Sequence, residues 1–546
     1  MVTLSEIYGE IVEKWFGGRD ERPFIANAIR EIEKNWDRNI FVIEAPTGYG
    51  KSTISATIAA YSLQEELKST IAFPLRTLLE DQYNKFKGLF GNKLGKRYMH
   101  NPDSPYLIKP VTLTTIDTLA LTLFGIPPED LDKAVKYWDG TSSGSLGHYL
   151  FSQASVALSN IVLDEVHLLA DSTKSLNFLF ALMHAAIDND QKLVLMSATI
   201  PEALKKRIKE FNPDVCMVEF NESFDRKFVE ERRKKKYRIN LIALASVEKF
   251  GSLERILLEG SKKFSKITVV FNTIGDAVYF YNNIKEKIPE FKKLLLHSRF
   301  SEMDREKKAE LLAEMKKSEK FVIVTTQVIE AGVDISSNLF ITEIAPASSL
   351  IQRLGRFLRY GEREGEVYIW YEVDDRGELA RWKDDRYKVY DYSLTALTLE
   401  KLAEMKNFSV HVDYDRLLDV YGEFEVDERG VNDLRRILMN FENINSAVEK
   451  FFELEGSFVR DSFIIPVVPY SVIEEKRRSS KVPVSFETFK NFKVYGCIVS
   501  DEFVSAEKLK CNLSSPKALL RDMIRKSIAA FVVDGDYDSE MGLVKR

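Results

Sequence analysis

Three ionisable side chains follow a short apolar run in the segment IVLDEVHLLA, residues 161–170. Asp164 and Glu165 are adjacent, and His167 lies two residues further on. A structural role is the simpler explanation, because acidic residues are common where a strand leaves the core. A metal–nucleotide site is the alternative, because a phosphate-loop nucleotidase needs one carboxylate for Mg²⁺ and a group that activates water. The segment alone does not decide between them.

A glycine-rich segment, APTGYGKS, follows an expected strand and opens an expected helix. Two glycines allow the tight turn that points backbone N–H groups at a phosphate. In such a loop Lys51 reaches the β and γ phosphates, and the Ser52 hydroxyl ligates Mg²⁺. The carboxylates of the first segment then become the expected metal ligand and the expected base. The predicted ATP-binding loop comprises Ala45, Pro46, Thr47, Gly48, Tyr49, Gly50, Lys51 and Ser52.

Arginines recur in QRLGRFLR, residues 352–359. Arg356 and Arg359 are three residues apart, so they are expected to share one face of a helix. Guanidinium groups are planar and permanently charged, and an arginine finger raises phosphoryl-transfer rates by about 10³ to 10⁵. Surface ion pairs are the alternative role for an arginine-rich helix. The catalytic role is favoured by Gly355, which interrupts the helix, and by Gln352 beside the arginines.

The elements that would position these segments alternate along the chain. From about residue 39, short apolar runs alternate with amphipathic stretches, which predicts parallel strands with helices on both faces. The alternation restarts after a basic run at residues 230–238. The sequence therefore predicts an α/β protein with two tandem domains and a smaller C-terminal domain of mixed helix and strand. The expected boundaries are 1–225 and 240–395 for the α/β domains, 226–239 for a basic linker, and 396–546 for the accessory domain.

Composition limits the class of protein. The chain has 546 residues, 45% of them hydrophobic, and a formal net charge of −5. The negative charge argues against coating nucleic acid through bulk charge, but it allows a narrow basic channel. No apolar run approaches the roughly 18–20 residues of a membrane span, and the acidic first residues do not resemble a signal peptide. The three cysteines lie far apart, which fits a reducing cytosol and predicts a cytoplasmic protein with no membrane partner.

The ordered motifs resemble those of superfamily 2 helicases, which carry two RecA-like domains. APTGYGKS is similar to motif I, DEVH at 164–167 to motif II of the DExH type, and SAT at 197–199 to motif III. The resemblance implies that ATP binds between two RecA-like domains and that a strand crosses the opposite face. The remaining matches are FPLRTLLEDQ (73–82), TTID (114–117), VVFNTIGDA (269–277), TTQVIEAGVDIS (325–336) and QRLGRFLR.

The resemblance also implies roles for individual residues. His167, Ser197 and Thr199 would couple hydrolysis to movement along the strand. For two candidate strand contacts, His297 and Arg299, a packing or solvated role is equally open. The expected catalytic residues are Lys51, Asp164, Glu165, Gln352, Arg356 and Arg359, and the expected metal ligands are Ser52 and Asp164. Further nucleotide contacts are expected at Phe24, Gly332 and Asp334. The expected nucleic-acid contacts are Arg76, Thr115, Asn272, His297, Arg299 and Thr326.

Longer stretches narrow the resemblance to the CRISPR-associated helicase of type I interference systems. They are SQASVALSNIVLDEVH (152–167), LLLHSRFSEMDREKKAELL (294–312), APASSLIQRLGRFLRYG (345–361) and YDSEMGL (537–543). The resemblance implies a translocase that uses ATP and Mg²⁺ to move 3′ to 5′ along single-stranded DNA and so unwinds target DNA. It also implies recruitment to an R-loop made by an RNA-guided CRISPR surveillance complex.

Two departures from the family pattern are visible. Ile25 stands where the family's adenine-reading element has glutamine, and Phe24 beside it either stacks on the base or packs in the core. Many members carry a nuclease domain built on a His-Asp dipeptide, whereas none of the six histidines here is followed by Asp. We therefore expect the split form of the family, with a separate HD nuclease on another polypeptide.

Two alternatives stay open at this point. A DExH helicase of DNA repair or RNA metabolism would carry the same motifs, because phosphate and sugar contacts hold little sequence information. An ATP-gated recruitment module would bind the nuclease and the surveillance complex without translocating. Preference for single-stranded DNA over RNA tests the first alternative. An inactive Glu165→Gln chain that still supported target degradation would favour the second.

Overall fold

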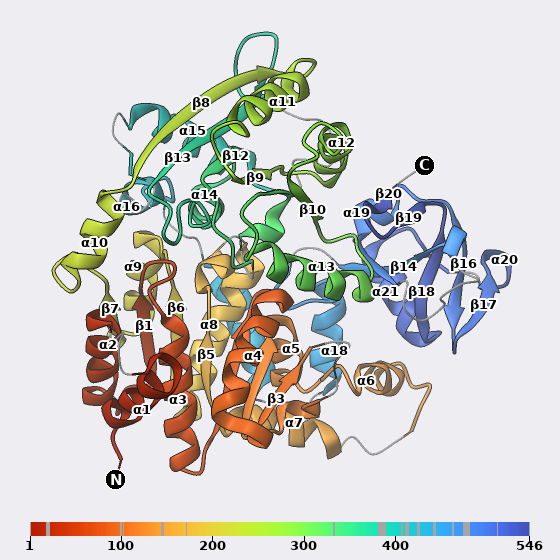
Figure 1. Cartoon of the computed structure of the whole chain (residues 1–546). Helices are drawn as coiled ribbons and strands as arrows, with labels where there is room; N and C mark the ends of the chain where they lie inside the picture. The colour runs from red at the N-terminus through yellow and green to blue at the C-terminus, as the bar shows by residue number, and fades with distance from the viewer. Residues whose placement is uncertain are drawn as a thin grey trace. The chain divides into compact units, whose positions relative to one another are not determined.

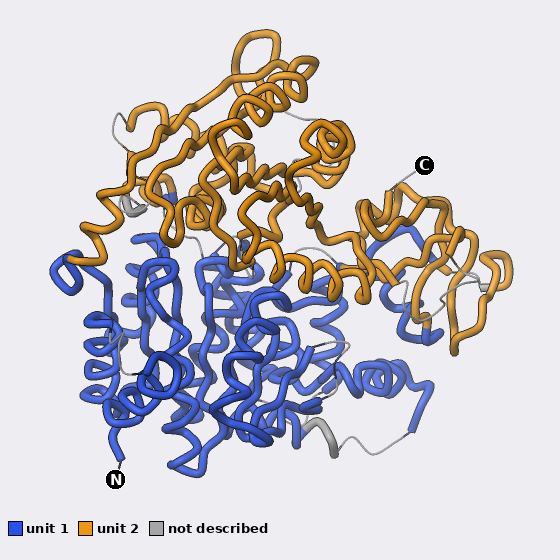
Figure 2. Tube along the Cα trace, in the orientation of Figure 1, with its two compact units in different colours: residues 1–226, 421–463, 512–527 blue, residues 227–420, 464–511, 528–546 orange. Residues whose placement is uncertain are grey.

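The computed structural model describes most of the chain. Its contacts divide the chain into two compact units, each made of three segments: residues 1–226, 421–463 and 512–527 form unit 1, and residues 227–420, 464–511 and 528–546 form unit 2 (Figure 2). The described residues are 2–17, 22–98, 101, 103–143, 147–170, 172–330, 333–380, 389–405, 408–409, 414–422, 426–439, 444–460, 463–472, 481–509 and 511–544.

Unit 1 is built on a seven-stranded parallel sheet with the order β3-β4-β2-β5-β6-β1-β7 (Figure 1). Every residue of the central strands β5 and β6 is buried, as expected where helices cover both faces of a parallel sheet. The strands are β1 (Ile40–Glu44), β2 (Lys68–Phe73), β3 (Leu94–Arg97), β4 (Val111–Thr115), β5 (Ser159–Leu163), β6 (Leu193–Ser197) and β7 (Cys216–Glu219).

Helices connect these strands and supply the rest of the core. Most apolar side chains of helix α8, for example, are buried in the same core as the strands of the sheet. The helices of this part of unit 1 are α1 (Leu4–Phe16), α2 (Pro23–Lys34), α3 (Lys51–Gln64), α4 (Arg76–Phe90), α5 (Ile116–Leu123), α6 (Leu131–Trp138), α7 (Gly147–Ala157), α8 (Thr173–Asp188) and α9 (Glu202–Phe211).

Three helices from the C-terminal part of the chain complete unit 1: α17 (Glu428–Met439), α18 (Ile444–Glu453) and α21 (Pro516–Arg525). Their apolar side chains belong to the same core as the central strands. Phe458, just after α18, stacks on Phe124 with 4.0 Å between ring centroids. These contacts anchor distant sequence to the first sheet.

Unit 2 holds a six-stranded parallel sheet with the order β10-β11-β9-β12-β13-β8. Its strands are β8 (Lys236–Ala245), β9 (Lys266–Val270), β10 (Lys292–Leu296), β11 (Phe321–Thr325), β12 (Leu339–Glu343) and β13 (Glu364–Val373). Its helices are α11 (Lys249–Gly260), α12 (Ile274–Ile284), α13 (Glu302–Met315), α14 (Ala347–Leu354), α15 (Tyr392–Glu404) and α16 (Tyr414–Leu418).

A second, mixed sheet of five strands also belongs to unit 2, in the order β15-β14-β18-β16-β17, together with the hairpin β19–β20. These elements are β14 (Ile464–Pro469), β15 (Val482–Ser485), β16 (Val494–Val499), β17 (Glu502–Ser505), β18 (Ile528–Val533), β19 (Asp536–Asp538), β20 (Gly542–Val544), α19 (Phe486–Phe489) and α20 (Ala506–Leu509).

The prediction of two parallel α/β sheets in tandem is confirmed, but the expected boundaries differ from the units in two places. The expected linker at 226–239 is helix α10 (Arg226–Arg233) followed by the start of β8. β8 lies at the sheet edge and pairs with β13 over its whole length. Charged residues are typical of edge strands, so this strand resembles a solvated linker in sequence. The expected accessory domain at 396–546 is shared between the two units.

Within the described part of the chain, every helix is too short or too polar to span a membrane.

Candidate active site

Three motif segments of unit 1 lie at neighbouring strand ends. The glycine-rich loop follows β1, the DEVH segment follows β5, and the SAT segment begins at the last residue of β6. Strand β6 pairs with both β1 and β5, and all three run parallel. Their carboxyl ends therefore meet at one edge of the sheet, which is where α/β proteins place ligands.

The glycine-rich loop has the backbone that a phosphate cradle requires. Gly48 and Gly50 have φ values of +76° and +106°, in the left-handed region that favours glycine. Helix α3 begins at Lys51 directly after Gly50, so its first N–H groups face the loop. The Lys51 ammonium donates a hydrogen bond to the Ala45 carbonyl at 3.2 Å, within the same loop. The loop can thus bind phosphate with backbone dipoles and one lysine.

Asp164, Glu165 and His167 form what we call the acid cluster. Burial and the neighbouring Glu165 charge raise the pKa of Asp164 to about 7, and the Lys51 charge offsets this only in part. The Glu165 N–H donates to Asp164 Oδ1 at 3.0 Å, and Glu165 itself has a φ of +54°. One buried and one partly buried carboxylate with one nearby lysine fit a divalent cation. Carboxylate and hydroxyl oxygens, here Asp164 and Ser52, are ligand types that Mg²⁺ prefers.

His167 links the acid cluster to the SAT segment. Its Nδ1 lies 2.7 Å from Ser197 Oγ and 3.5 Å from Glu165 Oε2. Ser197 Oγ in turn donates to the Thr199 carbonyl at 3.0 Å and accepts the Thr199 N–H at 3.2 Å. Burial lowers the pKa of His167 to about 4, so the ring is neutral at pH 7. The structure therefore brings together the three residues that were expected to couple hydrolysis to movement.

Phe24 has a core role in the structure. Its ring is fully buried and packs on Tyr49, Phe220 and Phe224, with 5.4–6.0 Å between centroids. The Tyr49 hydroxyl accepts the Phe24 N–H at 3.3 Å and donates to Asp225 Oδ2 at 2.9 Å. The ring presents no open face to a base, so the expectation that Phe24 stacks on adenine is not supported.

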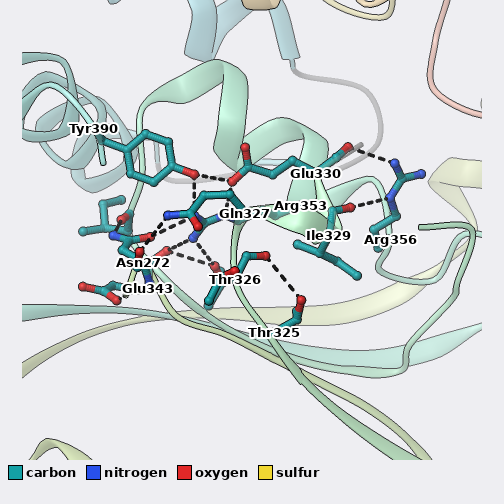
Figure 3. A network of polar contacts seen from close by, with 12 residues as sticks. Asn272, Thr325, Thr326, Gln327, Ile329, Glu330, Glu343, Arg353, Arg356 and Tyr390 are labelled. Atoms are coloured by element: carbon teal, nitrogen blue, oxygen red, sulfur yellow. Dashed lines mark hydrogen bonds and ion pairs between the residues drawn. The ribbon is translucent and has the colours of Figure 1, made fainter. Parts of the chain in front are cut away.

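Unit 2 gathers its motifs at strand ends in the same way. Asn272 follows β9, Thr326 follows β11 and Glu343 ends β12, and these strands are neighbours in the order β11-β9-β12. The guanidinium of Arg353, from α14, lies among them and is fully buried (Figure 3). We call Asn272, Glu330, Glu343, Arg353 and Tyr390 the arginine network.

Arg353 uses every one of its N–H donors inside unit 2. A guanidinium group has five N–H bonds in a fixed plane. The acceptors are Glu330 Oε1 (2.8 Å), Thr342 Oγ1 (3.2 Å), the Glu343 carbonyl (2.9 Å), Asn272 Oδ1 (2.8 Å) and the Tyr390 hydroxyl (2.8 Å). The sequence analysis missed this residue. The available signal was its spacing, because Arg353 stands three residues before Arg356 in the same motif.

The expected shared helix face for Arg356 and Arg359 is wrong. Helix α14 ends at Leu354 with Gly355 as its C-cap, so both arginines follow the helix. Leu358 has a φ of +45° and donates its N–H to the Ser337 carbonyl, which turns the chain away from a helical path.

The two arginines make separate contacts. Arg356 donates to the Ile329 carbonyl at 3.2 Å and to the Glu330 carbonyl at 2.9 Å. Arg359 pairs with Asp334 at 3.5 Å. Burial raises the pKa of Asp334, but the charges of Arg359 and Lys316 lower it overall to about 2.

The other nucleotide candidates of this region are Gln352, which is buried in α14, and Gly332, which lies outside the described residues.

Known protein families match parts of both units. Residues 22–207 match the DEAD/DEAH box helicase family, and residues 263–362 match the family described as CRISPR-associated nuclease/helicase Cas3, C-terminal. The CRISPR-associated nuclease/helicase Cas3 of Methanocaldococcus jannaschii is 27% identical over 422 residues, which cover 70% of this chain and 52% of the relative. The CRISPR-associated helicase Cas3 of Thermoproteus tenax is 28% identical over 368 residues, which cover 64% of this chain and 58% of the relative.

The crystal structure of T. fusca Cas3 has the same fold. It matches with a TM-score of 0.64 and 15% identity, over 98% of this chain and 72% of that chain. T. fusca Cas3 has also been solved with ADP and with AMPPNP.

The chain is therefore similar to the Cas3 helicases in sequence and in fold. The family resemblance and the two RecA-like domains expected from the sequence are confirmed. The chain spans about half the length of the curated relatives it matches.

Two of the expected nucleic-acid contacts of this chain, Asn272 and His297, are engaged within unit 2. The Asn272 amide donates to the Ile344 carbonyl at 2.8 Å and accepts from Arg353. His297 Nε2 donates to the Met541 carbonyl at 2.9 Å, and Nδ1 accepts the Arg299 N–H at 3.1 Å. Burial lowers the pKa of His297 to about 3. The structure does not support a nucleic-acid role for either side chain, and His297 has the packing role.

The other four candidates stay predictions. Arg76 begins α4, is half-buried, and holds its guanidinium 4.3 Å from the centroid of the Tyr98 ring. Thr115 caps α5, and Thr326 is buried directly after β11. Arg299 donates to Thr488 Oγ1 at 3.1 Å. Of these, Arg76 and Arg299 combine a positive charge with partial exposure, which suits contact with a phosphate backbone.

Proposed function

We propose that this chain is an ATP-driven translocase that moves 3′ to 5′ along single-stranded DNA and unwinds target DNA in CRISPR type I interference. It would act in the cytoplasm on the strand that an RNA-guided surveillance complex displaces. The observation that carries the proposal is a chain of side-chain contacts. Glu165 Oε2 lies 3.5 Å from His167 Nδ1, and hydrogen bonds join His167 to Ser197 and Ser197 to Thr199. Hydrolysis alone does not need this connection, whereas a motor must pass the state of its nucleotide to another part of the domain.

Each residue of the ATP site has a distinct task. The N-terminus of α3 and Lys51 bind the β and γ phosphates. Ser52 and Asp164 would hold Mg²⁺, which when bound neutralises charge on the phosphates. Glu165 accepts a proton from the attacking water. ATP as the substrate is supported by the nucleotide-bound structures of T. fusca Cas3, a relative in fold.

Arg356 and Arg359 are assigned to the same reaction by the family's motif order. Their positively charged guanidinium groups would stabilise the negative charge on the transferring phosphoryl group better than a neutral side chain could. Loss of the γ phosphate then changes what Glu165 contacts. His167 passes that change to Ser197 and Thr199, which we propose alters the grip on the strand.

We further propose that DNA cleavage is supplied by a separate HD nuclease, as the resemblance implies. The purified chain would then leave a labelled R-loop uncut in the presence of Mg²⁺, Mn²⁺ or Co²⁺. Cutting by this chain, abolished by chelation, would show that it carries the nuclease activity itself.

Steady-state ATP hydrolysis tests the central proposal. The purified chain would be assayed alone and with single-stranded DNA, duplex DNA or RNA of matched sequence, with Glu165→Gln as the blank. We expect strong stimulation by single-stranded DNA. Stimulation mainly by RNA would move the chain to an RNA branch of the DExH enzymes. Equal activity without nucleic acid would leave an ATPase and argue against a translocase.

Displacement of streptavidin tests the direction. A 3′-to-5′ motor pushes streptavidin from a biotin at the 5′ end of a single strand and leaves a biotin at the 3′ end occupied. The same oligonucleotide carrying either label, with Glu165→Gln as control, separates movement from spontaneous release. Displacement from the 3′ end would contradict the proposed direction.

A further inference from the structure

Glu330 lies between two arginines of the same motif. Its carboxylate accepts from Arg353 Nε at 2.8 Å and from the Tyr390 hydroxyl, and its main-chain carbonyl accepts from Arg356 Nη2 at 2.9 Å (Figure 3). The Tyr390 hydroxyl also accepts from Arg353 Nη2 at 2.8 Å. Three side chains, those of Glu330, Arg353 and Tyr390, thus form a closed ring of hydrogen bonds. The main-chain carbonyl of Glu330 also binds Arg356.

We propose that Glu330, Arg353 and Tyr390 are positioning residues that fix the Arg356 guanidinium for phosphoryl transfer. This inference rests on the proposed function, in which Arg356 contacts the transferring phosphate. Tyr390 is the unexpected member, because it lies outside every helicase motif identified in the sequence.

The ring is rigid for two physical reasons. Arg353 is fully buried and spends all five donors on groups at the ends of β9 and β12, on Glu330 and on Tyr390. Any rotation of the guanidinium would leave a buried N–H or a buried carboxylate without its partner, which is costly. The Glu330 main chain is therefore held in place, and with it the carbonyl that receives Arg356.

Burial also keeps the ring in one protonation state. Burial raises the pKa of Tyr390 well above 10; the Arg353 charge opposes this and the Glu330 charge adds to it. The hydroxyl therefore stays protonated and donates to Glu330 across the physiological range. A purely structural role would stabilise unit 2 without affecting the chemical step, so kinetics separates the two roles.

The experiment compares the variants Tyr390→Phe and Glu330→Gln with the wild-type chain. Tyr390→Phe keeps the aromatic side chain and removes only its hydroxyl group. Glu330→Gln keeps the shape of the side chain and removes its negative charge. The matched control is Tyr368→Phe, which removes a similar bond in the same unit, from the Tyr368 hydroxyl to Glu366 at 2.8 Å. The measurements are kcat and KM for ATP with single-stranded DNA, binding of a fluorescent ATP analogue, and the melting temperature.

We expect kcat to fall about tenfold in Tyr390→Phe and about a hundredfold in Glu330→Gln, since a misplacement of about 1 Å costs that much. KM, analogue binding and the control should stay within about twofold of wild type. The double variant should resemble Glu330→Gln alone, because residues of one network are not additive. Melting temperatures that fall while kcat stays unchanged would overturn the proposal, as would an increase in KM alone.

The wild-type chain and Arg356→Ala keep this inference separate from the proposed function. A wild-type chain without ATP hydrolysis overturns the proposed function, and the inference with it, before any variant is compared. An active wild type, an inactive Arg356→Ala, and Tyr390→Phe and Glu330→Gln variants with wild-type kcat would overturn only the inference.

Discussion

The acid cluster of unit 1 and the arginine network of unit 2 are built at equivalent places, the carboxyl ends of central parallel strands, yet their charges are balanced differently. In the acid cluster, burial and Glu165 raise the pKa of Asp164, and Lys51 offsets only part of this. In the arginine network, Arg353 is matched by Glu330 and by four further acceptors. The first arrangement leaves negative charge that the proposed Mg²⁺ would balance, whereas in the second the buried arginine has a partner for each of its donors within unit 2.

The largest expected effect tests whether the closed network serves a reactive arginine. Arg356→Ala should lower kcat for ATP hydrolysis by about 10³ or more, the loss typical of an arginine finger. The exposed Arg376, changed to Ala, is the matched control and should keep wild-type activity. A loss of less than about tenfold in Arg356→Ala would mean that this network does not serve catalysis.

The next effect tests the base in the acid cluster. Glu165→Gln keeps the size of the side chain but cannot accept a proton, so kcat should fall by about 10² to 10⁴. Binding of Mg²⁺ and a fluorescent ATP analogue should persist, because Lys51 and the loop backbone hold the phosphates. Lys51→Ala is the contrasting variant, in which analogue binding itself should weaken. Equal loss of binding in both variants would argue that Glu165 has a structural role.

A stability measurement tests the charge balance of the arginine network. Arg353→Met leaves the buried Glu330 carboxylate without its charged partner and should destabilise unit 2 by about 3–5 kcal/mol. The double variant Arg353→Met/Glu330→Met removes both charges and should recover part of that loss. Urea unfolding followed by tryptophan fluorescence measures both. If the double variant were less stable than Arg353→Met, the ion pair would not be the main interaction at this position.

The contrast between the two regions also explains what the sequence could predict. The acid cluster follows from local order, because a glycine-rich loop after one strand and DEVH after another identify both ends of the site. The start of β8 was assigned to a linker, because an edge strand beginning with Lys236 and Arg238 has the composition of solvated sequence.

The arginine network was missed for a different reason. Arg353 contacts groups from β9, β12 and the segment after β11, and only the strand order brings these together. Tyr390 carries no local signal, because its role depends on a contact with a residue 60 positions earlier in the chain. Spacing along a single helix could not show either contact, and it wrongly placed Arg356 and Arg359 on α14.

The smallest expected effect is on the pH dependence of stability. It concerns the two buried neutral histidines, His167 of the acid cluster and His297 of unit 2. Burial lowers the pKa of His297 to about 3, against an ordinary value of about 6.5 in the unfolded chain. The folded state therefore binds fewer protons than the unfolded state between these values. The contribution of His297 to the free energy of unfolding is therefore fully present above the pKa of the unfolded state, and it is lost as the pH falls toward the pKa of the folded state.

His297→Phe removes this titration, so the loss of unfolding free energy between pH 7 and pH 5 should shrink by about 2 kcal/mol. The variant also loses the bond to the Met541 carbonyl, which lowers stability at both pH values and cancels in the difference. Urea unfolding at the two pH values measures the change, with the half-buried His184→Gln as a control that should shift it less. An unchanged pH dependence would place the acid sensitivity elsewhere, with His167, whose pKa burial lowers to about 4, as the next residue to test.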